Sequence, residues 1–128
     1  MQYSFIIFIR PENTYKIKKT ARWESMARAN VAFAKYETKL FKLLFLQKLN
    51  GLNSFEDIYE WMGDKQATRN LAEKLLLPEE KIKEVYIMLI VFTHGVATMI
   101  ATGGANISDG ESSAILEKAY NAFVKAQK

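Results

Sequence analysis

One stretch near the C-terminus decides the fold: residues 78–104, PEEKIKEVYIMLIVFTHGVATMIATGG. Pro78 suits the first position of a helix, and the glutamates that follow it favour the positive end of a helix dipole. Gly103 and Gly104 are typical of a helix end. The stretch therefore predicts one helix of about 24 residues, which is about 36 Å long at about 1.5 Å per residue.

This predicted helix carries no charge from Val85 to Ser108 when His94 is neutral. Almost every side of it is apolar or small, and such a helix is buried all round. A bilayer, the middle of one domain, or a domain core combined with a second subunit would each bury it. We expect no membrane span, because threonines and His94 interrupt the apolar run and no second span occurs. A chain of 128 residues is small for enclosing such a helix completely, which favours the subunit interface.

The rest of the chain, from Asn13 onward, has helical patterning and no convincing strand alternation. Ser54 or Asn53 is a suitable cap for the third predicted helix, and Ser108 opens the last with capping-box spacing to Glu111. We therefore predict an all-α helical bundle of about six helices. Their expected ranges are residues 13–35, 36–49, 55–62, 63–77, 78–104 and 108–127.

Three motifs follow one another along the chain in an order that a known family shares. The alanine- and aromatic-rich stretch 27–46, ARANVAFAKYETKLFKLLFL, contains a long helix that meets a short one with a Leu-Phe-x-Leu-like pattern. Phe92-Thr93-His94-Gly95 follows a bulky apolar run and precedes small residues closed by glycines. The final helix, residues 108–127, comes next. Together these motifs, spanning about residues 21–128, resemble the C-terminal domain of TetR-family transcriptional regulators.

The resemblance implies that residues 13–128 form a ligand-binding and dimerisation domain, and that residues 1–12 are an N-terminal extension or remnant with no place in the family pattern. It also implies a symmetric homodimer built by the last two helices of each subunit. The family's DNA-binding module has about three short helices ahead of the first long helix. Only 12 residues precede that helix here. DNA contact is therefore expected only through a helix-turn-helix that is missing from this chain.

The composition excludes several kinds of chemistry. With no cysteine, the chain has neither disulfides nor thiolate metal sites, which is compatible with a cytoplasmic location. A single histidine and the lack of a glycine-rich phosphate loop argue against metal clusters and nucleotide binding. A catalytic triad would have to use His94, and no sequence pattern singles out a serine or an acidic residue as its partner. We therefore expect no enzyme activity, no metal and no cofactor.

The charge is uneven along the chain. Ten of the 18 Lys and Arg, but only three of the 14 Asp and Glu, lie in residues 1–50. These basic residues are either the solvated faces of helices or, by the resemblance, a surface next to DNA-binding helices. A second way to contact DNA is the helix, Gly63 turn and helix of residues 54–75. Acidic residues on both of its helices would oppose phosphates, which argues against it.

Aromatic and methionine side chains offer surfaces that suit apolar ligands. For each of them core packing is the simpler role, and for His94 that role is a buried, hydrogen-bonded imidazole. Collectively, the resemblance implies that some enclose a pocket for an apolar or aromatic small molecule, with Asn30 and His94 as polar anchors. The pocket candidates are Trp23, Asn30, Phe33, Phe41, Phe45, Phe55, Trp61, Met62, Met88, Phe92 and His94.

The residues expected at the subunit interface are small or apolar and lie in the last two predicted helices. They are Ile90, Thr93, Gly95, Ala97, Thr98, Ala101, Ile115, Ala119, Ala122 and Phe123. The function expected is that of a small-molecule-binding and dimerisation domain of a TetR-like regulator. The alternative is a structural or interaction module that dimerises without ligand and modulates a full-length regulator.

Overall fold

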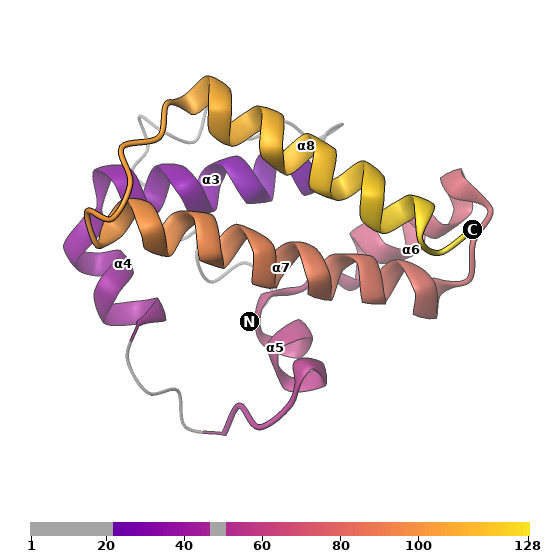
Figure 1. The fold of residues 1–128 in the computed structure, drawn as a ribbon. Coiled ribbons are helices and arrows are strands. Elements are labelled where there is room, and N and C mark those ends of the chain that lie inside the picture. Colours follow the sequence, from indigo (N-terminus) through magenta and orange to yellow (C-terminus); the bar gives the residue numbers. More distant parts are fainter. Residues whose placement is uncertain (1–21, 47–50) are drawn as a thin grey trace.

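The computed structural model describes residues 22–46 and 51–128, and within them helices joined by short loops make up all of the regular secondary structure (Figure 1). The prediction of an all-α bundle with about six helices is confirmed for this part of the chain. Residues 1–12, the start of the first predicted helix and the end of the second lie outside it. The helices are α3 (Arg22–Tyr36), α4 (Thr38–Phe45), α5 (Phe55–Met62), α6 (Lys65–Leu75), α7 (Glu79–Ala101) and α8 (Asp109–Lys125).

Side-chain caps explain where α5 and α6 begin. Ser54 Oγ accepts a hydrogen bond from the backbone N–H of Asp57 at 3.1 Å, and Asp57 Oδ2 accepts one from the N–H of Asn53 at 2.9 Å. Asp64 caps α6 in the same way, through the N–H of Ala67 at 3.0 Å. These bonds satisfy N–H groups that have no partner inside the helix.

The other helix ends follow the sequence signals with small differences. α6 ends at Leu75 because Leu76 adopts a left-handed conformation with φ of 57°, which stops the helix before the expected Leu77. Pro78 is the N-cap of α7 and not its first helical residue. Ser108 caps α8, as predicted, by accepting from the N–H of Glu111 at 3.1 Å.

The bundle is built around α7, which runs through its centre and packs against each of the other five helices (Figure 1). The buried residues of α7 recur every three or four positions, and this spacing places them on one face of the helix. The buried residues on this side are Ile82, Val85, Leu89, Thr93, Ala97 and Ala101. Each core cluster of the described residues includes side chains from α7.

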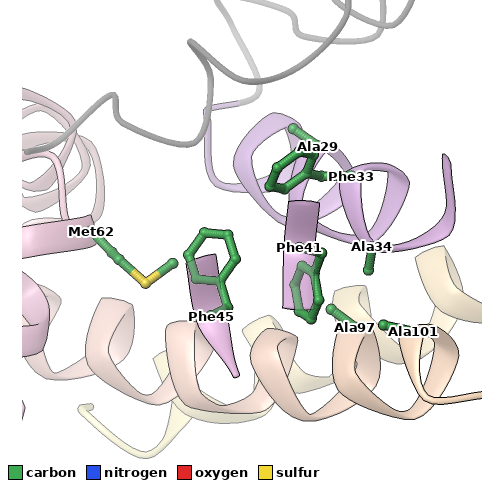
Figure 2. Packing of buried hydrophobic residues seen from close by; sticks show 8 residues of the cluster. All are labelled: Ala29, Phe33, Ala34, Phe41, Phe45, Met62, Ala97 and Ala101. Atoms are coloured by element: carbon green, nitrogen blue, oxygen red, sulfur yellow. The ribbon is translucent and has the colours of Figure 1, made fainter. Parts of the chain in front are cut away.

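The largest of these clusters joins α3, α4 and α5 to the C-terminal half of α7 (Figure 2). Small side chains on α3 and α7 let those helices approach, while aromatic rings from α3 and α4 fill the space between them. Phe33 and Phe41 are fully buried there, with ring centroids 6.3 Å apart in an edge-to-face arrangement. The cluster consists of Ala29, Phe33, Ala34, Phe41, Phe45, Met62, Ala97 and Ala101.

The opposite side of α7 is exposed in a single protomer. Val91 and Met99 are 47% and 51% exposed, and Gly95 lies between them on the same side. Within one protomer, α7 is therefore buried on one side, and burial of the other side by a second subunit stays a prediction. By length and composition alone, α7 is the one helix of residues 22–46 and 51–128 that qualifies as a membrane span. A core helix meets the same criterion, and α7 packs on five helices.

Candidate functional site

A cavity of about 340 Å³ lies between the end of α4, the segment leading into α5, α5 itself and the middle of α7. Its volume is at the lower end of the range of about 300–1,000 Å³ that is usual for ligand pockets. None of the described residues that line it is charged. The lining residues are Phe45, Leu52, Ile58, Trp61, Met62, Ile90, Val91 and His94.

Helical spacing brings the cavity walls together. α5 contributes Ile58 and Trp61, which are three residues apart and so lie on one face. α7 contributes Ile90 and His94 from one face in the same way. The ring of Trp61 packs on that of Phe45, the last residue of α4, with centroids 5.5 Å apart. This contact connects the α4 wall to the α5 wall.

The α5 wall is held in place by the turn into α6. A Cβ atom on Gly63 would lie 2.5 Å from the ring of Tyr59, so this close approach requires glycine. The hydroxyl of Tyr59 is also hydrogen-bonded to Thr68 Oγ1 at 2.6 Å, and both residues are buried. The turn and this hydrogen bond fix α5 against α6, and α6 packs in turn on α7.

His94 is the polar residue of the α7 wall. Its ring stacks against Phe41 at 6.0 Å between centroids and meets Phe45 edge-on at 6.3 Å. Burial lowers the pKa of the imidazole below its ordinary value of 6.5, so the ring is neutral at pH 7. Within the described residues neither ring nitrogen has a hydrogen-bond partner. A neutral imidazole offers one donor and one acceptor, and this one lies at the cavity.

The structure brings four of the predicted pocket residues together at this cavity, namely Phe45, Trp61, Met62 and His94. Phe33 and Phe41 pack in the same core cluster but do not line the cavity. Phe33 and Phe41 pack against the lining residues from the core side of the cavity wall.

The remaining pocket candidates lie elsewhere. Phe92 is on another side of α7 and packs edge-on against Phe123 of α8, with centroids 6.2 Å apart. Phe55, at the start of α5, is 61% exposed. Met88 is half-buried on α7, outside the cavity lining. The side chain of Trp23 lies outside the described part of the chain.

Three cavity residues are missing from the sequence-based candidates: Leu52, Ile58 and Val91. The three-residue spacing from Ile58 to Trp61 was the available signal for Ile58. Leu52 precedes α5 in a segment without periodicity, so no pattern points to it. Ile90, which the sequence places at the subunit interface, lines the cavity as well.

Asn30 lies in α3, buried from solvent, and its Oδ1 has no hydrogen-bond partner. It does not line the cavity at α5. A second hollow, also of about 340 Å³, separates α3 from the first turn of α8. Its walls are more polar and include Arg28 and Asp109, and Asp109 forms an ion pair with Lys35 at 3.1 Å.

By their exposure, the predicted interface residues other than Ile90 divide into three groups. Gly95, Ile115 and Ala122 are exposed, and a Cβ atom on Gly95 would meet nothing within 4 Å. Thr98 and Phe123 are half-buried. The others, apart from Ile90, are buried within the protomer: Thr93, Ala97, Ala101 and Ala119.

The α5–α6 pair carries few free positive charges for DNA. Lys65 lies 3.3 Å from Glu60, and Arg69 lies 3.9 Å from Glu79. These carboxylates compete with phosphates for the cations, which disfavours a DNA-binding role for the pair. In the part of the chain that the structure describes, no group of His, Asp and Glu could hold a metal ion.

Fold and cavity define a class: a small all-helical domain with an apolar cavity beside its central helix. No protein-family model, curated protein or solved structure matches this chain.

Proposed function

We propose that residues 13–128 form the small-molecule-binding and dimerisation domain of a TetR-like transcriptional regulator that acts in the cytoplasm. The observation that carries this proposal is the cavity between α4, α5 and α7, whose described lining residues carry no charge. Four side chains selected on the basis of the family resemblance meet there. DNA contact would come from a helix-turn-helix outside these residues.

The packing suggests how a ligand would act. A molecule in the cavity separates α4 and α5 from α7, and α3 packs on both α4 and α7. Widening the cavity therefore moves α3 relative to α7. In a TetR-like regulator α3 leads to the DNA-binding module, so this motion changes the separation of the two modules in a dimer. Only a ligand that binds one arrangement more tightly than the other shifts the equilibrium.

The dimer would use the exposed side of α7 together with α8. Val91, Gly95 and Met99 form an apolar strip without charge, and Ile115 and Ala122 are exposed on α8. Small residues such as Gly95 allow two helices to approach closely. Two helices from each subunit would make a four-helix interface around a two-fold axis.

The experiment that tests ligand binding is a thermal-shift screen of apolar and aromatic compounds against the wild type. A ligand at 100 times its dissociation constant stabilises the folded state by about 2.7 kcal/mol. Ile58→Trp fills the cavity and should abolish the shift. Phe92→Leu alters α7 on another side and should preserve it. A shift that survives Ile58→Trp would assign the binding site elsewhere.

A second candidate function is an interaction module that dimerises without ligand and pairs with a full-length regulator. The exposed strip on α7 favours this second function, because dimerisation through the strip does not require a ligand in the cavity. A dimer by light scattering, combined with no thermal shift from any compound, would favour this second function. A monomer at micromolar concentration would count against both.

A further inference from the structure

We infer that the cavity beside α7 binds a small, uncharged aromatic molecule that carries a single hydrogen-bonding group, which pairs with His94. This inference rests on the proposed ligand-binding function and specifies the chemistry of the ligand. Three properties of the cavity lead to it: the absence of charge among the described residues of its walls, its aromatic surfaces and volume, and the imidazole of His94, which has no hydrogen-bond partner among those residues.

The first property is charge. Among the described residues that line the cavity, seven side chains are apolar or aromatic, and the eighth, His94, is neutral at pH 7. A charged group placed against these side chains loses part of its hydration, and none of the described lining residues offers an opposite charge in return. Carboxylates, phosphates and ammonium groups are therefore poor occupants. A neutral ligand avoids that cost.

The second property is shape. Phe45 and Trp61 form one wall, and the imidazole of His94 meets Phe45 edge-on. Planar rings pack well against such walls in offset or edge-to-face arrangements. About 340 Å³ corresponds to about ten water-sized groups at about 30 Å³ each. Two fused rings with one substituent have this size.

The third property is hydrogen bonding. The described residues leave both nitrogens of His94 without a partner, whereas the ring itself is fixed by stacking on Phe41. A fixed polar group in an apolar wall orients a ligand with little loss of conformational entropy. A hydroxyl can donate to the unprotonated nitrogen or accept from the protonated one. Such a hydrogen bond is worth about fivefold in affinity.

The test uses three probes with one ring system: naphthalene, 2-naphthol and 2-naphthoate. Binding is followed at neutral pH by quenching of Trp61 fluorescence in a Trp23→Phe background, where Trp61 is the remaining one of the two tryptophans. We expect 2-naphthol to bind about fivefold more tightly than naphthalene. We expect 2-naphthoate to bind most weakly, because its carboxylate would be buried without a counter-charge.

Two variants of His94 test its role. His94→Phe retains an aromatic ring and removes both nitrogens, so it should bind naphthalene and 2-naphthol equally. His94→Gln restores a donor and an acceptor, so it should recover a preference for 2-naphthol. Phe92→Leu, on the same helix outside the cavity, should preserve the wild-type preference.

The outcomes separate this inference from the proposed function. Equal wild-type affinity for naphthalene and 2-naphthol would overturn the role of the hydrogen bond while leaving ligand binding intact. Tightest binding of 2-naphthoate would overturn the preference for neutral molecules. Persistence of the 2-naphthol preference in His94→Phe would overturn the assignment to His94. Failure of every probe to quench Trp61 in folded protein would overturn this inference together with the ligand-binding function.

Discussion

Replacing Phe41 with alanine should remove a large part of the stability of this domain. Phe41 has no exposed surface, and its ring contacts those of Phe33, Phe45 and His94 at centroid distances of 6.3, 5.1 and 6.0 Å. Truncating a buried phenylalanine costs about 3–5 kcal/mol, through lost transfer free energy and the cavity left behind. The loss of three ring contacts puts the expected value at about 4 kcal/mol.

The matched control is Phe55→Ala. Phe55 is the same residue type in a neighbouring helix, but it is 61% exposed and belongs to none of the core clusters of the described residues. Its truncation should change the free energy of unfolding by less than about 1 kcal/mol, as is usual for surface substitutions. Domains of this kind are stable by about 5–15 kcal/mol, so the two variants differ clearly.

The assay is urea unfolding followed by circular dichroism at several protein concentrations. Concentration matters because dimerisation would add to the apparent stability. Near-equal effects of the two substitutions would refute the placement of Phe41 in the buried core. A second readout is rescue: the space left by Phe41→Ala is apolar, and benzene should raise its melting temperature more than that of Phe55→Ala.

Three further predictions concern a titration, a helix cap and the interface. The pKa of His94 is lowered on folding, so the unfolded state binds more protons, and stability should fall as pH falls from 6.5 through the folded-state value. Urea unfolding midpoints measured between neutral and mildly acidic pH check this. Because the chain has one histidine, His94→Gln should weaken the dependence of the midpoint on pH, and an unchanged dependence would contradict the prediction. Ser108→Ala removes the side-chain acceptor for the N–H of Glu111 and should cost about 1 kcal/mol, whereas an unchanged urea midpoint would contradict the cap. Gly95→Glu puts a charge on the exposed strip of α7 and should give folded monomers by light scattering, and a persistent dimer would exclude that strip from the interface.

The elements of this fold were predictable from local signals in the sequence. Ser54 and Ser108 mark helix starts because their hydroxyls accept from N–H groups three residues later. The end of α6 was harder to predict from the sequence, because the helix stops at a left-handed leucine, Leu76, and not at a glycine. A leucine at that position gives no signal of a helix end.

The orientation of α7 was not predictable, and this limited the prediction of the site. A helix that is apolar on nearly every side has no polar face to show which side meets the core. Phe92 and His94 are two residues apart, about 200° around the helix, and they pack against α8 and α4 respectively. The family resemblance placed both among the candidates for one pocket. Only the packing of α4, α5 and α8 separates them.

The central position of α7 also determines the order in which the domain can form during synthesis. The ribosome releases the chain from its N-terminus, so α3 to α6 emerge before the helix on which each of them packs. Ile82, Val85 and Ala97 contribute to three different clusters, and none of these clusters is complete until α7 has left the exit tunnel. The nascent chain therefore exposes the rings of Phe33, Phe41 and Phe45 until late in translation. This interval is when a chaperone has most apolar surface to bind.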